Sequence, residues 1–257
     1  MHNFLTTIAK KAGLCLQQYY QRGVKAKKKD NFGDIVTVAD YAAEKIIIQA
    51  IRKQYPKYNI LSEEAGYMKK SSAYTFIIDP LDGTKNFANH VPLFGTTIAL
   101  AYQGAIIEGV IFDPIHTELF YAKKNHGAYL NNEKIKTSPK KNIKHLMCGV
   151  ANVRTRTDNK LYNNLRQEFY NYSSSFKILG SAVVDLSYVA CSRLDMYIMG
   201  GVYPWDVAAG GLIIQEAGGI ISTVSGKKWE PLNMKQEILV SANKILHQKI
   251  LKIINHL

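Results

Sequence analysis

The sequence predicts a layered α+β sandwich, in which pairs of helices alternate with sheets. Three observations predict this fold class. Helical periodicity dominates the first part of the chain, and short β-rich runs separated by Gly, Pro and Asn follow it. Helical and extended segments then alternate over the second half. The chain has 257 residues, 47% of them hydrophobic, which is enough to bury a core of this kind.

Two helices are expected in the first part of the chain. Apolar side chains recur at loose helical spacing over residues 3–21, and Gly23 is a plausible stop for that helix. A basic, polar loop is expected to run to Gly33. Residues 38–54 have the clearest helical pattern. Pro56 ends this second helix, because a proline ring cannot continue the backbone hydrogen bonding.

Strands are expected from Tyr74 onward. The runs TFIID, TTIALAYQ, AIIEGVIFD and ELFYA predict a meandering antiparallel sheet to about residue 137. The run LMCGVAN opens a second sheet region. The helices expected after it lie near residues 158–170, 182–192 and 206–217, with a surface helix over Ile245–Leu251. Gly218 and Gly219 close the third of these helices.

The chain is strongly basic, with a formal net charge of +13. One interpretation is a surface covered with solvated lysines. The other is an electric field that attracts anionic partners, such as phosphorylated substrates or RNA. Lysines also cluster at Lys25, Lys27, Lys28 and Lys29. They are not interleaved with aromatic residues, as a stacking platform for bases requires.

The sequence has no mark of export or membrane insertion. No apolar run approaches the roughly 18 residues of a membrane span, and Lys10 and Lys11 interrupt any signal-peptide core. The three cysteines, Cys15, Cys148 and Cys191, are scattered and lack C-x-x-C spacing. This pattern fits free thiols in a reducing compartment. We therefore expect a cytoplasmic protein that does not contact a membrane.

The most informative segment is Asp79-Pro80-Leu81-Asp82-Gly83-Thr84, which follows the apolar strand TFII. Its two carboxylates, bent by the proline and relieved by the glycine, can converge on one point beyond the strand end. Hard divalent cations prefer oxygen ligands in such an arrangement. An ordinary turn capped by aspartate has the same residue pattern, so that alternative stays open on this segment alone.

Other acidic residues also lie at the ends of expected elements. The pair Glu63-Glu64 follows a short apolar run, and adjacent glutamates repel each other unless a cation or a basic group lies between them. An exposed loop pair is the alternative. Asp206 opens a helix, where it is either a ligand or an ordinary N-cap. Thr37-x-x-Asp40 resembles a capping box for the helix that follows.

Taken together, the acidic residues favour metal-assisted phosphate chemistry. Glu63, Asp79, Asp82 and Asp206 each lie at the end of an expected element, and the three aspartates directly adjoin Pro, Gly or Trp. Two metal ions held by shared carboxylates would clamp a phosphate and lower the pKa of an attacking water. The sequence contains no G-x-S-x-G, P-loop or H-E-x-x-H motif, and its seven histidines are dispersed.

Two long segments resemble a known family. IIDPLDGTKNF at 77–87 is similar to the first signature of the inositol monophosphatase family, and WDVAAGGLIIQEAGG at 205–219 is similar to the second. DIVTVAD at 34–40, LSEEAG at 61–66 and GSAVVDLSYVACSRLD at 180–195 also match, in the family's order. The resemblance implies an αβαβα sandwich, usually a homodimer. It also implies hydrolysis of phosphomonoesters with two to three Mg²⁺ ions, and inhibition by lithium.

The resemblance implies metal ligands at matching positions. Glu63, Asp79 and the Leu81 carbonyl would hold the first Mg²⁺. Asp79, Asp82 and Asp206 would hold the second, and Glu63 would reach a third through water. We expect a single inositol monophosphatase-like domain over residues 1–257. Its α+β part, to about residue 140, carries the metal site, and an α/β part follows from about residue 141.

The resemblance also implies catalytic and substrate-binding residues. Thr84, hydrogen-bonded to Asp40, would orient and deprotonate the attacking water, with Glu63 as a further catalytic residue and Glu64 behind the metal ligands. The backbone amides of Gly83 and Thr84 would cradle the phosphate. The groups that would meet the substrate's hydroxyls are Asp82, Asp206 and the segment Gly180-Ser181-Ala182.

Two positions depart from the family pattern. Inositol phosphatases usually carry a glutamate where this chain has Met199, and a thioether is only a weak hydrogen-bond acceptor. Lys85 resembles the related 3′-phosphoadenosine 5′-phosphate phosphatases, whereas the residues after it are more similar to the inositol phosphatase branch. These departures put a preference for inositol in question.

We therefore expect a Mg²⁺-dependent phosphomonoesterase that acts on a small polyol or sugar phosphate, such as inositol 1-phosphate. The alternatives of the same class are phosphatases of 3′-phosphoadenosine 5′-phosphate, fructose 1,6-bisphosphate or histidinol phosphate. A further alternative, from another class, is an RNA-binding or transcription-complex protein on the same scaffold. The complete acidic set favours the enzyme, since a pure binder has no use for all four ligands.

Overall fold

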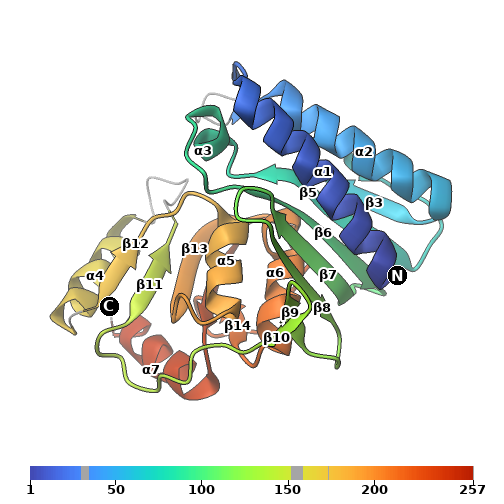
Figure 1. Ribbon diagram of the computed structural model, residues 1–257. Helices are drawn as coiled ribbons and strands as arrows, with labels where there is room; N and C mark the ends of the chain where they lie inside the picture. Colours follow the sequence, from blue (N-terminus) through green and yellow to red (C-terminus); the bar gives the residue numbers. More distant parts are fainter. Residues whose placement is uncertain (30–34, 152–158, 173, 257) are drawn as a thin grey trace.

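The computed structural model describes residues 1–29, 35–151, 159–172 and 174–256. Within them, three helical layers alternate with two large sheets (Figure 1). This arrangement confirms the layered α+β sandwich predicted from the sequence. Gly33, where the basic loop was expected to end, and Asp34, the first residue of the 34–40 motif, lie outside the described residues.

The first helical layer consists of α1 (His2–Arg22) and α2 (Val38–Gln54), which both cover one face of the larger sheet (Figure 1). In α1 the buried positions include Leu5, Ile8 and Leu16, which recur at helical spacing. Leu14, part of the predicted apolar pattern, is 51% exposed because it falls outside that stripe. Between the two helices in the sequence, β1 (Lys27–Lys28) and β2 (Ile35–Val36) pair in antiparallel fashion.

The larger sheet has eight strands in the order β10-β9-β8-β7-β6-β5-β3-β4. Its strands are β3 (Asn59–Ser62), β4 (Gly66–Met68), β5 (Tyr74–Asp82), β6 (Gly95–Tyr102), β7 (Ala105–Asp113), β8 (Glu118–Lys123), β9 (Ala128–Leu130) and β10 (Glu133–Ile135). The predicted antiparallel meander is confirmed from β5 to β10. The exception is β3, which pairs parallel to β5 with Ser62 beside Ile78. The carboxyl ends of these two strands therefore meet at one edge.

The middle layer consists of α5 (Ala182–Ala190) and α6 (Pro204–Glu216), which lie between the two sheets. Both helices are buried along nearly their whole length, since each packs against a sheet on either side. Asp206 is the third residue of α6, after Tyr203 at the N-cap and Pro204. The N-cap interpretation of Asp206 is therefore wrong, because Pro204 lets the helix begin earlier.

The smaller sheet has five strands in the order β12-β11-β13-β15-β14. Its strands are β11 (Met147–Val150), β12 (Ser175–Lys177), β13 (Met196–Val202), β14 (Ile220–Thr223) and β15 (Gln236–Ser241). Helices α4 (Asn159–Asn171) and α7 (Lys244–Ile254) cover its outer face. The expected surface helix corresponds to α7, which buries Leu246 and Ile250 in the hydrophobic core between this helix and the smaller sheet.

Candidate active site

The candidate site lies where β3 and β5 end and where α2, α3 (Thr84–Ala88), α5 and α6 begin. Parallel pairing brings Glu63, directly after β3, beside the end of β5. The backbone N–H of Glu63 donates to the Ile78 carbonyl at 3.1 Å and continues the ladder by one residue. The acidic residues that the sequence singled out are thereby collected at one edge of the larger sheet.

Three carboxylates converge at this edge. One oxygen each of Asp79, Asp82 and Asp206 lies within 4.8 Å of the others. Burial raises the pKa of Asp79 well above its usual range, and the charges of Glu63, Asp82 and Asp206 raise it further. Buried like charges of this kind favour a bound cation. An all-oxygen donor set of carboxylates fits Mg²⁺, which proteins usually bind through one or two carboxylates and substrate phosphates.

The turn after β5 has a conformation that only glycine adopts without strain. The Leu81 N–H donates to Asp79 Oδ1 at 3.0 Å, and the ladder with β6 is irregular between Asp79 and Asp82. Gly83 has φ +85°, and a Cβ there would lie 2.9 Å from the Leu93 carbonyl oxygen. The backbone can therefore bend sharply and leave both aspartates facing the same point.

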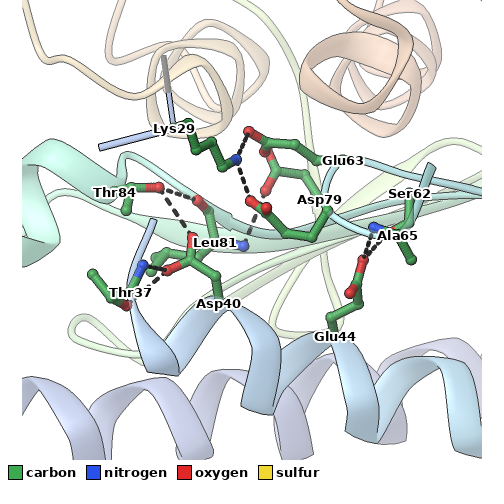
Figure 2. Close-up of polar contacts among 11 residues, drawn as sticks. Lys29, Thr37, Asp40, Glu44, Ser62, Glu63, Ala65, Asp79, Leu81 and Thr84 are labelled. Atoms are coloured by element: carbon green, nitrogen blue, oxygen red, sulfur yellow. Dashed lines mark hydrogen bonds and ion pairs between the residues drawn. The ribbon is translucent and has the colours of Figure 1, made fainter. Parts of the chain in front are cut away.

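Asp40 combines two contacts. Its Oδ2 accepts from the N–H of Thr37 at 2.8 Å and from the Thr37 hydroxyl at 2.7 Å, so the predicted capping box is confirmed. Its Oδ1 lies 3.2 Å from Thr84 Oγ1, which also lies 3.0 Å from the Leu81 carbonyl oxygen (Figure 2). Burial raises the pKa of Asp40, against the opposing effect of its bonds to Thr37.

A lysine faces the glutamate pair. Lys29 Nζ lies 2.8 Å from Glu63 Oε1 (Figure 2). It also contacts Glu64 Oε1. The alternative of an exposed loop pair is therefore wrong, because a basic group lies between the two glutamates. Burial raises the pKa of Glu64 to about 7, although its bond to Lys29 acts in the other direction.

The segment before α5 is tied to the same turn. The hydroxyl of Ser181, the N-cap of α5, donates to Asp82 Oδ2, which also accepts from the Val183 N–H at 3.0 Å. Asn86 Nδ2 donates to the carbonyl oxygens of Leu93 and Leu179, both at 2.7 Å. Gly180 and Ala182, which adjoin Ser181, are thus held beside the carboxylates.

The two departures from the family pattern lie in different surroundings. Met199 is on β13, is 9% exposed and belongs to the core between the sheets. Its Sδ accepts a hydrogen bond from the Tyr197 hydroxyl at 2.9 Å. Lys85 is an exposed residue of α3. A polar glutamate at position 199 would therefore have to fit into largely apolar surroundings.

Sequence reasoning missed three residues with polar contacts at the site. Lys29 was visible only as part of the lysine cluster, and Asn86 only as a letter of the first signature. Glu44 follows Asp40 by one helical turn on α2 and is buried, and that spacing was the signal that could have found it. All three act across long sequence separations that a single sequence does not reveal.

The comparisons with known proteins agree with this geometry. The profile described as "Inositol monophosphatase family" matches residues 1–257. The chain belongs to the inositol monophosphatase family. One relative in this family is the protein of Escherichia coli (strain K12) called "Nus factor SuhB", which is 36% identical over 230 residues, or 88% of this chain and 86% of that protein.

Two further members of the inositol monophosphatase family extend the comparison. The Thermotoga maritima protein called "Fructose-1,6-bisphosphatase/inositol-1-monophosphatase" is 31% identical over 253 residues, or 98% of this chain and 95% of that one. The crystal structure of extragenic suppressor protein suhB from Bartonella henselae superposes with a TM-score of 0.91. It is 31% identical to this chain and covers 98% of it, and the match covers 97% of the suhB chain.

Among the described residues, no helix has the length and apolar character needed to cross a membrane.

Proposed function

We propose that this protein is a Mg²⁺-dependent phosphomonoesterase that hydrolyses a small polyol or sugar phosphate, such as inositol 1-phosphate. The observation that carries the proposal is the convergence of Asp79, Asp82 and Asp206 beside the Thr84–Asp40 pair. The first set offers ligands for divalent cations, and the second offers a route for a proton. A phosphate monoester needs both, because its uncatalysed hydrolysis is very slow.

The proposed metal ligands come from three elements. Glu63, Asp79 and the Leu81 carbonyl oxygen would hold one Mg²⁺, and Asp79, Asp82 and Asp206 a second, with Glu63 reaching a third through water. Bound Mg²⁺ supplies positive charge for the phosphate oxygens and makes water more acidic. Because the ligands come from both sides of residue 140, we also propose that residues 1–257 work as one domain.

The remaining residues would orient the reactants and move a proton. The Thr84 hydroxyl can accept a proton from the attacking water and pass its own to Asp40 Oδ1, which lies 3.2 Å away. Burial favours protonation of Asp40, as its raised pKa indicates. Glu64 would help to orient Glu63 through Lys29, which contacts both carboxylates.

The phosphate and hydroxyl groups of the substrate would meet a second set of residues. The N–H groups of Gly83 and Thr84 begin α3 and would donate to phosphate oxygens. Asp82 and Asp206, with the segment Gly180-Ser181-Ala182, would contact the hydroxyls next to the scissile ester. Hydrogen bonds from Ser181 and Val183 hold the Asp82 carboxylate in a fixed orientation for this task.

Two observations bear on the proposed substrate class of polyol and sugar phosphates: the name of a relative, and Met199 in this chain. The name of the Thermotoga maritima relative combines fructose 1,6-bisphosphate and inositol 1-phosphate, which supports polyol and sugar phosphates as a class. Met199 disfavours a strong preference for the inositol ring. Fructose 1,6-bisphosphate, histidinol phosphate and 3′-phosphoadenosine 5′-phosphate therefore belong in the same test, and we expect lithium to inhibit whichever reaction is found.

A second candidate function is a role in a transcription complex or in RNA binding. The observations that favour it are the relative called "Nus factor SuhB", at 36% identity, and the net charge of +13. A basic surface binds nucleic acid in a salt-dependent way. Phosphatase activity that persists at high salt while RNA binding disappears would separate the two functions.

The deciding experiment is a screen of phosphorylated metabolites. Phosphate release is measured with Mg²⁺ and with excess chelator, in the wild type and in Asp82→Asn. We expect release in Mg²⁺ alone, and only from the wild type. Sedimentation equilibrium on the same preparation tests the expected cytoplasmic homodimer, and cell fractionation tests its location.

A further inference from the structure

A buried glutamate lies beneath the turn that carries Glu63. Glu44 is on α2 and only 7% exposed. Its Oε1 accepts from the Ser62 hydroxyl at 2.5 Å and from the Ala65 N–H at 2.8 Å (Figure 2). Ser62 and Ala65 flank the Glu63-Glu64 pair on its two sides. One carboxylate oxygen thus ties together both ends of the turn between β3 and β4.

Backbone contacts hold the two ends of the turn within the sheet. The Glu63 N–H bonds to the Ile78 carbonyl oxygen, and Gly66 pairs with Ser62 in the ladder between β3 and β4. Lys29 contacts the two glutamates only at their carboxylates, from the residue that follows the two-residue strand β1. The Glu44 bond to Ala65 adds a contact between the turn and the long helix α2.

Asp40 and Glu44 lie four residues apart on α2, about 6 Å along the axis. Asp40 contacts Thr84, and Glu44 contacts the turn that carries Glu63. The same rigid helix thereby sets the position of both the proton route and a proposed metal ligand. Burying a carboxylate costs free energy, so a glutamate at position 44 calls for a role beyond filling space.

We propose that Glu44 is a positioning residue that holds the Glu63 turn in the orientation needed for metal binding. This inference rests on the proposed Mg²⁺ site, and it concerns a residue that touches neither metal nor substrate. Groups that orient metal ligands in this indirect way typically change metal affinity by about 10- to 100-fold. The loss of Glu44 should therefore weaken metal binding more than it slows the chemical step.

The test uses three substitutions. Glu44→Ala removes both hydrogen bonds, Ser62→Ala removes one, and Glu44→Gln keeps an acceptor oxygen at the same place. Glu108→Ala is the matched control. Glu108 is also a buried glutamate (6% exposed) with a hydroxyl partner, Tyr121 at 2.7 Å, but it lies on β7 away from this turn. Each protein is measured for Mg²⁺ binding by calorimetry without substrate, for kcat at saturating Mg²⁺, and for its melting temperature.

The expected results separate positioning from general stability. Glu44→Ala should raise the Kd for Mg²⁺ about tenfold or more, with kcat at saturating Mg²⁺ within about threefold of the wild type. Glu44→Gln should restore most of the affinity, and Ser62→Ala should raise Kd a few-fold. Glu108→Ala should lower the melting temperature without changing Kd. If Glu44→Ala does not fold, Ser62→Ala and Glu44→Gln decide the matter.

Three results would overturn the inference. Unchanged Mg²⁺ affinity in Glu44→Ala and Ser62→Ala would show that the turn needs no support from α2. A Kd change of equal size in Glu108→Ala would assign the effect to stability. If the wild-type protein itself binds no Mg²⁺, the proposed function fails and this inference falls with it. Binding by the wild type with no difference in the variants rejects the inference alone.

Discussion

Two polar clusters in this protein differ in composition: one consists of carboxylates, and the other of a histidine and two hydroxyls. At the edge of the larger sheet, three carboxylates converge within 4.8 Å. His247, a buried residue of α7, lies between two hydroxyls, with Nε2 2.9 Å from Ser222 Oγ and Nδ1 3.1 Å from Ser241 Oγ. His247, Asp79 and Asp206 are buried, whereas Asp82 is half-buried. Of the two clusters, the first alone gathers groups of the same charge.

The two clusters differ in the charge that they carry. The Ser222 hydroxyl donates to the Thr223 carbonyl, so its oxygen can accept from one nitrogen of His247. The Ser241 hydroxyl can donate to the other nitrogen, which leaves the imidazole neutral and fully bonded. Burial lowers the pKa of His247 to about 4, in keeping with a neutral ring. The carboxylates raise each other's cost of ionisation instead, and an added cation relieves that repulsion.

The largest expected effect comes from breaking the acidic cluster. Asp82→Asn should reduce turnover nearly to background and leave the fold intact, because the amide oxygen can still accept from Ser181 and Val183 while the charge is lost. Phosphate release and circular dichroism check the two halves of this statement. His247→Gln is the control and should retain activity. Full wild-type activity in excess chelator would refute the metal mechanism.

The second effect concerns the proton route beside the cluster. Thr84→Ala should lower kcat by about 10²-fold or more, with a smaller change in KM, because the hydroxyl next to Asp40 is lost. Thr84→Ser keeps a hydroxyl and should restore most of the rate. Steady-state kinetics at saturating Mg²⁺ provide the measurement. An unchanged kcat in Thr84→Ala would mean that metal alone activates the water.

Met199 tests whether an apolar residue on strand β13 of the smaller sheet limits specificity. Met199→Glu should improve the use of inositol 1-phosphate relative to other phosphomonoesters by roughly one to two orders of magnitude in kcat/KM, the scale of a buried hydroxyl that regains about 1–3 kcal/mol of pairing. Met199 is only 9% exposed, so the new carboxylate would be buried and the variant should also unfold at a lower temperature.

A panel of substrates measured in both proteins gives the comparison for Met199. Met199→Gln is the matched control, since it adds an acceptor without a charge. If the wild type already prefers inositol 1-phosphate strongly and the substitution does not help, position 199 does not set specificity.

The smallest effect concerns stability alone. The pKa of His247 is about 4 in the folded chain against an ordinary value of 6.5. Between these values the unfolded chain binds a proton that the folded chain does not, so stability should fall as the pH drops from 6.5 toward 4. Melting temperatures of the wild type and His247→Gln should converge over this range on acidification. Parallel curves would mean that His247 does not contribute to the pH dependence.

Much of this fold was predictable from local patterns. The α2 helix was expected because its apolar spacing and the Thr37–Asp40 capping box agree, and the meander of β5 to β10 because each run ends at a turn signal. The parallel pairing of β3 with β5 was not predicted. Strand order depends on contacts between distant segments, which periodicity does not encode.

The site was predictable where one segment carries its own chemistry. The turn from Asp79 to Thr84 brings its proposed metal ligands together through local geometry, with Gly83 in a left-handed conformation. Glu44 and Lys29 were missed because their partners are far away in sequence. Asp206 was misplaced by one feature, the start of α6 at Pro204. Local sequence signals thus indicated the proposed metal ligands but not the residues that hold those ligands in place.

The most direct test of the central claim is phosphate release from inositol 1-phosphate, fructose 1,6-bisphosphate, histidinol phosphate and 3′-phosphoadenosine 5′-phosphate by the purified protein. The assay is run in Mg²⁺ and in excess chelator. The convergence of Asp79, Asp82 and Asp206 predicts release from at least one of these substrates in Mg²⁺ and none in chelator. A folded protein that releases no phosphate in Mg²⁺ from any of them, or releases it equally in chelator, would contradict the account.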